Sequence, residues 1–136
     1  MRENLKIILV DQSIDFRVAL KKVLCARFPT ARVSEASDAI AALDAAGIAA
    51  PDILIFELEA DPFGRTSVAR LVRGACDDVV VIALSVYPYP EYQQAASDRS
   101  VDLFYCKSAN GFANDMVRDM ERYFGSSGPA LISETA

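Results

Sequence analysis

The stretch Asp52–Gly64 reads DILIFELEADPFG, and it places a carboxylate at the end of an apolar run. Four consecutive apolar residues, Ile53–Phe56, lead directly into Glu57. A short continuous apolar run is typical of a strand that is buried on both faces of a parallel sheet. Because a buried carboxylate needs a partner, Glu57 indicates a polar site at the end of this strand.

Four further segments are predicted to be strands, and the first of them, KIILV, is again a short continuous apolar run. The second alternates between apolar and polar residues, so we expect it at an edge of the sheet. The five predicted strands are Lys6–Val10, Ala31–Ala36, Ile53–Leu58, Val79–Ser85 and Val101–Cys106.

The segments between these strands have helical periodicity. We expect helices from the Ser13 cap to Phe28, from the Ser37 cap to Ala46, over Thr66–Arg73, from about Pro90, and over Asn110–Phe124. Gly47 and Gly74 are expected to end the second and third helices. The inward stripe of the last helix is predicted to consist of Phe112, Met116, Met120 and Tyr123.

Strands that alternate with helices predict an α/β fold, in which a parallel sheet is covered on both faces. In such sheets the functional groups gather at the carboxyl ends of the strands, beside the topological switch point. The residues at these ends are Asp11, Gln12, Glu57, Glu59, Ser85, Val86 and Lys107.

Composition narrows the function further. The chain has 136 residues, 52% hydrophobic and 24% charged, which suits one domain with a buried core. Its net charge of −5 argues against a nucleic-acid surface, which needs clustered Lys and Arg. The absence of histidine excludes Ser-His-Asp and Cys-His catalysis. No apolar run reaches the roughly 18 residues of a membrane span, so we expect no membrane contact.

Cysteine usage indicates a cytoplasmic protein. Cys25, Cys76 and Cys106 are far apart and form no CxxC pair, as expected of reduced thiols. Only four apolar residues separate the N-terminal MRENLK from Asp11, so no signal peptide is expected. Residues 125–136, GSSGPALISETA, have linker composition. We therefore expect a domain over residues 1–124 and a flexible tail or linker over residues 125–136.

Four strand-end motifs, taken together, resemble the receiver domain of bacterial response regulators over about residues 5–124. KIILVDQ resembles the first strand and its acids, and PDILIFEL resembles the third strand, which ends in the phosphoacceptor aspartate. VIALS resembles the fourth strand with its Ser or Thr, and FYCKS the fifth strand with its lysine. The resemblance implies a flavodoxin-like (βα)5 three-layer sandwich with a five-stranded parallel sheet of order 2-1-3-4-5.

The resemblance also implies a role for each residue of the site. Glu57 occupies the phosphoacceptor position, and Asp11, Gln12 and Glu59 belong to the acidic pocket. Ser85 and Phe104 stand where the family has its switch residues, and Lys107 matches the family's lysine. In the family, carboxylates hold Mg²⁺ and an aspartate oxygen takes the phosphoryl group.

This sequence departs from that pattern at the positions that carry the chemistry. Glu57 replaces the acceptor aspartate, Gln12 replaces an acid that ligates the metal, and Val86 stands where the family usually has Ala or Gly. Ser108 replaces the usual proline after the lysine. These departures predict an atypical receiver that is not an enzyme, with no cofactor and no catalytic residue. Mg²⁺ held by Asp11 and Glu57 is the alternative.

Three roles for Glu57 are open from the sequence: a structural carboxylate paired with Lys107, a permanent mimic of the phosphorylated state, or a working acceptor. The predicted function is a phosphorylation-independent protein-interaction module, with a histidine kinase, an output domain or a second copy as partner. One alternative is a Mg²⁺-dependent receiver phosphorylated by a histidine kinase. A flavodoxin-like cofactor binder is the other, although the acidic loop DQSID would repel a phosphate.

Overall fold

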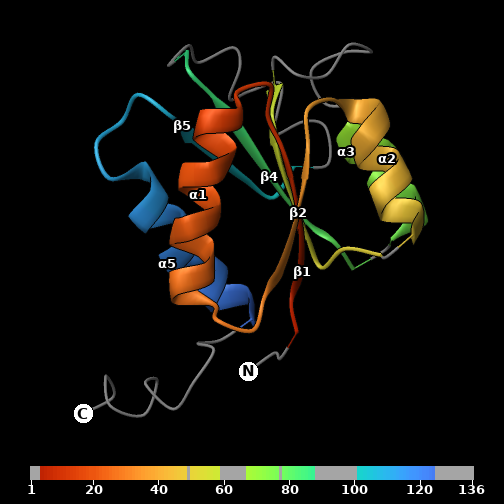
Figure 1. The fold of residues 1–136 in the computed structure, drawn as a ribbon, viewed down its shortest axis with the longest axis horizontal. Helices are drawn as coiled ribbons and strands as arrows, with labels where there is room; N and C mark the ends of the chain where they lie inside the picture. The colour runs from red at the N-terminus through yellow and green to blue at the C-terminus, as the bar shows by residue number, and fades with distance from the viewer. Residues whose placement is uncertain (1–3, 49, 59–66, 77, 88–100, 125–136) are drawn as a thin grey trace.

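The computed structural model describes residues 4–48, 50–58, 67–76, 78–87 and 101–124, and these residues form one sheet with helices on both faces (Figure 1). The strands are β1 (Lys6–Val10), β2 (Arg32–Ala36), β3 (Ile53–Glu57), β4 (Val80–Ser85) and β5 (Leu103–Cys106). The helices are α1 (Ile14–Arg27), α2 (Ala39–Ile48), α3 (Ser67–Ala75) and α5 (Phe112–Phe124).

The five strands are parallel and lie in the order β2-β1-β3-β4-β5, which confirms the predicted flavodoxin-like topology. β3 and β4 are buried along their whole length, as their continuous apolar sequences require. β2 lies at an edge and is mostly exposed, as its alternating sequence indicates. From β1 the chain first adds β2 on one side and then crosses to add β3 on the other. The topological switch point therefore lies between β1 and β3, which are neighbours in the sheet.

Two apolar clusters cover the two faces of the sheet. Side chains alternate between the faces along each strand, so Ile7 and Leu9 face α1 and α5 while Ile8 and Val10 face α2 and α3. Figure 1 shows α1 and α5 on one side of the sheet and α2 and α3 on the other. We call these the α1–α5 cluster and the α2–α3 cluster. The three predicted layers are present.

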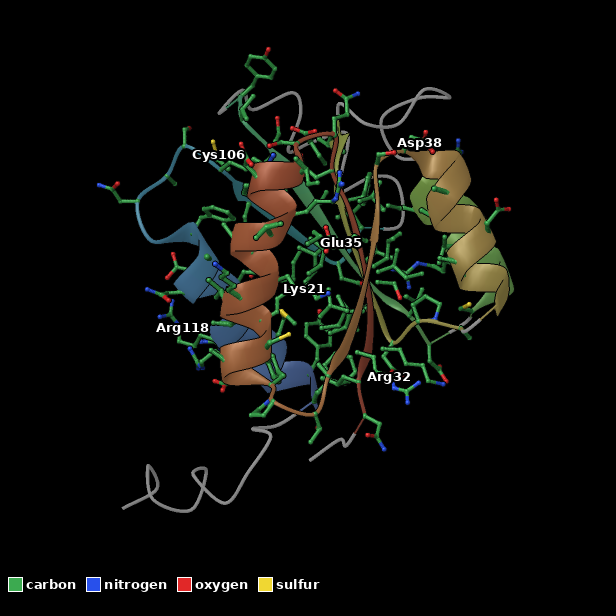
Figure 2. The ribbon with its side chains drawn as sticks, in the orientation of Figure 1. Lys21, Arg32, Glu35, Asp38, Cys106 and Arg118 are labelled. Carbon is green, nitrogen blue, oxygen red and sulfur yellow. The ribbon has the colours of Figure 1, made fainter. Side chains whose placement is uncertain are left out.

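The start of α1 agrees with the sequence and the start of α2 does not. The Ser13 hydroxyl accepts a hydrogen bond of 3.1 Å from the backbone N–H of Phe16, which is the expected cap. At α2 the cap is Asp38, whose Oδ1 accepts from the Ala41 N–H at 2.9 Å, and not Ser37 as predicted. Figure 2 shows Asp38 at this end of α2. Both residues are good caps, so their sequence alone could not separate them.

Two predicted helix ends are wrong for a common reason. Gly47 lies inside α2, which continues to Ile48, and Gly74 lies inside α3, which continues to Ala75. A glycine ends a helix when it adopts a left-handed conformation. Among the described glycines, only Gly111 has a positive φ, of 72°, and it precedes α5. Gly47 and Gly74 keep helical backbone angles and the helices pass through them.

The inward face of α5 is also shifted from the prediction. Met116, Val117 and Met120 are buried as part of the α1–α5 cluster, whereas the side chain of Tyr123 is 50% exposed. The 3.6-residue repeat continues from Met120 to Phe124, which packs on the cluster and takes the place predicted for Tyr123.

Some predictions fall outside the described residues. These are the fourth helix from about Pro90 and the tail over residues 125–136, so the division at residue 124 stays a prediction. None of the helices in the described part of the chain is long and apolar enough to cross a membrane.

The capping assignment at α2 is open to a direct test. We expect Asp38→Ala to lower the free energy of unfolding by about 0.5–2 kcal/mol, because the Ala41 N–H loses its acceptor. The matched control Ser37→Ala should change it by less than about 0.5 kcal/mol. Urea unfolding followed by circular dichroism measures both, and a larger loss in the Ser37 variant would contradict the assignment.

Candidate functional site

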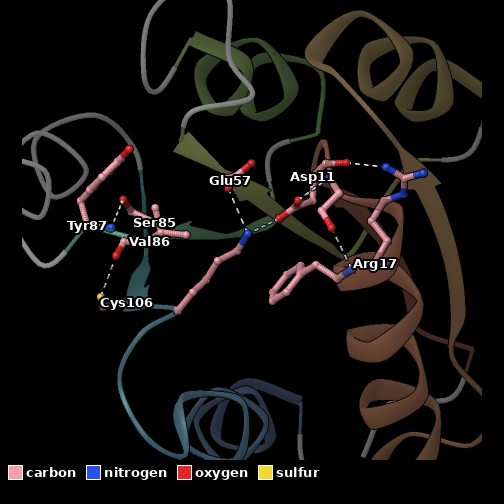
Figure 3. A network of polar contacts seen from close by, with 10 residues as sticks. Asp11, Arg17, Glu57, Ser85, Val86, Tyr87 and Cys106 are labelled. Atoms are coloured by element: carbon pink, nitrogen blue, oxygen red, sulfur yellow. Dashed lines mark hydrogen bonds and ion pairs between the residues drawn. The ribbon is translucent and has the colours of Figure 1, made fainter.

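The carboxyl ends of four strands bring the candidate residues together. Asp11 directly follows β1, Glu57 and Ser85 are the last residues of β3 and β4, and Lys107 directly follows β5. Parallel pairing aligns these ends, with Glu57 opposite Leu84 in the sheet register. Figure 3 shows Asp11 and Glu57 near each other at the carboxyl end of the sheet, with Ser85 to one side, next to Tyr87.

The centre of this region is the ammonium of Lys107. Its Nζ lies 2.5 Å from Asp11 Oδ2 and 3.0 Å from Glu57 Oε2. The exposed fractions of the three side chains are 10% for Lys107, 1% for Asp11 and 12% for Glu57. The two carboxylates contact the same ammonium and are largely removed from water. They need a cation between them, because two negative charges held close together repel strongly in a low-dielectric setting. Lys107 supplies that cation.

Asp11 is held on both sides of its carboxylate. Its Oδ1 accepts a hydrogen bond of 2.9 Å from the Ser13 N–H, while Oδ2 accepts from Lys107. Its backbone oxygen accepts from Arg17 Nη1 at 2.5 Å, and Arg17 in turn pairs with Glu35 at 3.0 Å. We call Asp11, Glu57 and Lys107 the ion-pair site. Asp11 therefore ties the start of α1 to this site and to the β2 edge.

The Lys107 ammonium also contacts an aromatic ring. Nζ lies 3.8 Å from the centroid of the Phe16 ring, within the range of a cation–π interaction. Phe16 was predicted only as a core residue of the first helix, and it does pack on the α1–α5 cluster. Its contact with Lys107 joins residues 91 positions apart (107 − 16), so helical periodicity gives no sign of it.

The other predicted site residues are placed differently. Gln12 is exposed, and Glu59 lies outside the described residues. Ser85 is buried, and its Oγ accepts a hydrogen bond of 3.1 Å from the Tyr87 N–H. Phe104 is half-buried and packs against the α2–α3 cluster. Of the predicted set, the ion-pair site joins Asp11, Glu57 and Lys107.

The edge of the site beyond Ser85 is formed by the ends of β4 and β5. Val86 is exposed, and its carbonyl oxygen lies 3.8 Å from the thiol of Cys106. The same thiol lies 2.9 Å from the Ser108 hydroxyl. Within the described part of the chain, no group of three or more His, Cys, Asp or Glu side chains is arranged to hold a metal ion.

A second polar pair joins β5 to α5 on the face covered by α1. The Tyr105 hydroxyl donates a hydrogen bond to Asp119 Oδ2. Burial, this hydrogen bond and the negative charges of Asp119 and Asp115 raise the pKa of the Tyr105 phenol well above its ordinary value of about 10.

Several solved structures have the same fold. The signal receiver domain of NarL from Mycobacterium tuberculosis is 21% identical, with 89% of this chain and 98% of that one covered and a TM-score of 0.75. Chemotaxis response regulator CheY4 of Vibrio cholerae is 21% identical, with 88% and 98% covered and a TM-score of 0.74. A CheY-like receiver domain protein from Methanospirillum hungatei is 15% identical, with 89% and 94% covered and a TM-score of 0.77.

Sequence comparison gives no comparable match: no protein-family profile and no curated protein matches the chain. At these identities the structural likeness establishes the fold, and the chain has the fold of response-regulator receiver domains.

The ion-pair site predicts that Glu57→Gln changes the free energy of unfolding in opposite directions in the parent chain and in a variant that lacks Lys107. Lys107→Met should lower the free energy of unfolding by about 3–5 kcal/mol, because it leaves two buried carboxylates without their cation. Glu57→Gln should destabilise the parent chain, yet stabilise the Lys107→Met variant by removing the repulsion from Asp11. Urea unfolding at neutral pH measures the four chains.

Lys21→Met is the matched control for the loss of a lysine. Its ammonium lies 3.7 Å from Glu35 and its side chain is 43% exposed, so this change should cost at most about 1 kcal/mol. If Glu57→Gln had the same sign in both backgrounds, the central role of Lys107 would be wrong.

The raised pKa of Tyr105 predicts late ionisation in an alkaline titration. The folded chain favours the neutral phenol of Tyr105, and this preference adds to the free energy of unfolding. The contribution is complete below about pH 10 and is lost as the pH rises through the folded-state pKa. Phenolate absorbance should show one of the five tyrosines ionising late. Tyr105→Phe should remove this step and Asp119→Asn should move it to lower pH; a titration unchanged in both variants would refute the assignment.

Proposed function

We propose that the chain is an atypical receiver domain of a bacterial two-component signalling pathway, acting through protein–protein contacts and without aspartyl phosphorylation. The observation that carries this proposal is the position of the Lys107 ammonium, 2.5 Å from Asp11 and 3.0 Å from Glu57. The receiver fold supports the signalling class. The Lys107 ammonium, which lies between the two carboxylates of the pocket, supports a function that does not depend on phosphorylation.

Glu57 is the first reason to expect no phosphoryl transfer. A glutamate side chain is longer than an aspartate side chain by one methylene, about 1.5 Å of additional reach. In this pocket the extra length coincides with a direct contact between Glu57 and Lys107. An oxygen that accepts from an ammonium is a weaker nucleophile toward phosphorus than a free carboxylate oxygen, because its electron density is already shared with the proton.

The donor set is also a poor fit to Mg²⁺, the ion that the receiver family uses. Mg²⁺ requires near-octahedral oxygen ligation and binds through carboxylates with several retained waters. Here one oxygen from each of Asp11 and Glu57 is already directed at Lys107, and Gln12 is neutral and exposed. A divalent ion bound to these carboxylates would have to displace the Lys107 ammonium. The displaced ammonium would stay close to the ion, and the two positive charges would repel each other. We therefore expect no Mg²⁺ to be held by Asp11 and Glu57 in this arrangement.

Among the three roles considered for Glu57, the structural carboxylate is best supported. A mimic of the phosphorylated state would be expected to engage the Ser85 hydroxyl. Among the described residues Glu57 accepts from Lys107, a contact that a mimic could also make, but not from Ser85, whose Oγ accepts from the Tyr87 N–H. On this account Glu57 holds the Lys107 ammonium in one arrangement, and the domain is presented to a partner in that arrangement.

The proposal includes a cellular setting. We expect a protein partner in the pathway, such as a histidine kinase or an output domain, and self-association into a homodimer is the further option. We expect no resident cofactor, no enzymatic activity, no contact with nucleic acid and a cytoplasmic location, in keeping with the chain's net charge of −5.

The deciding experiment is incubation with Mg²⁺ and a small phosphodonor, followed by intact mass measurement. We expect no gain of one phosphoryl group, because a Glu57 oxygen already accepts from Lys107 and the described residues contain no cluster arranged to hold a metal ion. A receiver domain with the usual aspartate is the positive control. A stoichiometric gain that disappears in Glu57→Gln would overturn the proposal in favour of a Mg²⁺-dependent receiver.

A restored variant makes the negative result informative. Gln12→Asp combined with Glu57→Asp should show a rise in melting temperature on adding Mg²⁺, since the first change adds a hard carboxylate and the second restores the length of the family's aspartate. The parent chain should show none. Because this readout needs no phosphoryl transfer, the bulk of Val86 beside Ser85 does not affect it. An equal response in both chains would contradict the account.

A further inference from the structure

We propose that Phe16 is a positioning residue for Lys107, and that Phe112 couples this contact to α5. The inference rests on the proposed role of Lys107 as the cation of the closed pocket. It concerns what holds that lysine in place and where a change in its position would be felt.

The first step is the contact between the ammonium and the ring. Lys107 Nζ lies 3.8 Å from the Phe16 ring centroid while it also contacts Asp11 and Glu57. A cation over an aromatic face is held by the ring quadrupole, and the attraction grows when water is excluded. The Lys107 side chain is only 10% exposed, so this is the water-poor case. The ring is therefore a third contact that restricts the ammonium, beside the two carboxylates.

The second step is that the backbone of Phe16 is itself tied to the pocket through the cap of α1. The backbone N–H of Phe16 donates to Ser13 Oγ, and the N–H of Ser13 donates to Asp11 Oδ1. The other oxygen of Asp11 accepts from Lys107, whose ammonium lies over the Phe16 ring. These four contacts close a circuit of Lys107, Asp11, Ser13 and Phe16. A movement of any member disturbs the positions of the others.

The third step leads from the circuit to the last helix. The rings of Phe16 and Phe112 are stacked, with centroids 6.2 Å apart and an interplanar angle of 12°. Phe112 is the first residue of α5. A groove of about 130 Å³ between α1 and α5 is lined by both rings together with Ala19, Leu20, Val23 and Ala113.

The consequence is a route from the pocket to the surface between α1 and α5. Displacing the ammonium removes the charge that Phe16 faces, and Phe16 is free to move against Phe112. Coupling of this kind is reciprocal, so a change at Phe112 should also alter Lys107. The route does not pass through Ser85, which the Tyr87 N–H engages, or through Phe104, which packs on the opposite face of the sheet.

The test uses the nuclear magnetic resonance signals of the Lys107 side chain in the intact chain. A ring face shields protons above it, so the methylene protons next to the Lys107 amine should lie upfield of those of Lys6, Lys21 and Lys22. We expect Phe16→Leu to abolish this shift and Phe16→Tyr, which keeps a π face, to retain it. Phe112→Leu should reduce it, because Phe16 loses its stacking partner.

Phe28→Leu is the matched control. Phe28 is fully buried in the same α1–α5 cluster and ends the same helix, so this variant loses a core ring far from the ammonium. It should keep the Lys107 shift even where it lowers stability. An upfield shift that survives in Phe16→Leu, or that is lost equally in Phe28→Leu, would overturn the positioning role. A shift unaffected by Phe112→Leu would overturn the coupling to α5.

A second measurement reports the freedom of the amine. Acylation by a small amine-reactive ester, read by peptide mass analysis, should be about 5- to 30-fold faster at Lys107 in Phe16→Leu than in the parent, and within about twofold of the parent in Phe16→Tyr. Lys21 serves as the internal reference. Equal Lys107 rates in all chains would refute the proposal. These results do not depend on phosphoryl transfer, so they fail separately from the phosphodonor experiment.

Discussion

The Lys107 ammonium is the point at which three distant parts of the chain meet. Asp11 comes from the end of β1, Glu57 from the end of β3, and Lys107 from the end of β5, so one ion-pair site closes the carboxyl edge of the sheet. The carboxylates are nearly buried, and without a cation each would be costly in the presence of the other. Burying an ion pair yields little net stability, because desolvation offsets the attraction. Its main effect is to select one arrangement of the strand ends.

Much of the fold follows from the sequence because the strands are short and continuously apolar. A strand buried on both faces has few alternatives, which is why three predicted strands are found within one residue of their predicted bounds. The first agrees at both ends, the third ends at Glu57 and not at Leu58 as predicted, and the fourth begins at Val80 and not at Val79. Helix ends depend on closer competition. Ser37 and Asp38 can both cap α2, and Gly47 can either end a helix or continue one, so differences of about 1 kcal/mol decide between them.

The candidate site shows a similar division. The ends of parallel strands must share one edge, so the proximity of Asp11, Glu57 and Lys107 could be expected from their positions after apolar runs. The role of Phe16 could not. Its spacing places it on the apolar face of α1, and only the tertiary fold brings the ammonium of Lys107, which follows β5, over its ring. Gln12 follows Asp11 directly, yet it is exposed while Asp11 is buried.

The charge of the ion-pair site limits what it can respond to. Two carboxylates and one ammonium leave an excess of negative charge, and the neighbouring Gln12 adds no cation. A phosphoryl group is an anion, so entering this site would require either a further cation or the loss of a carboxylate charge. The ammonium, by contrast, contacts both carboxylates and also the Phe16 ring, whose stacking partner begins α5. We infer that a signal reaches this domain more readily through a partner that moves Phe16 or Phe112 than through an anion that enters the pocket.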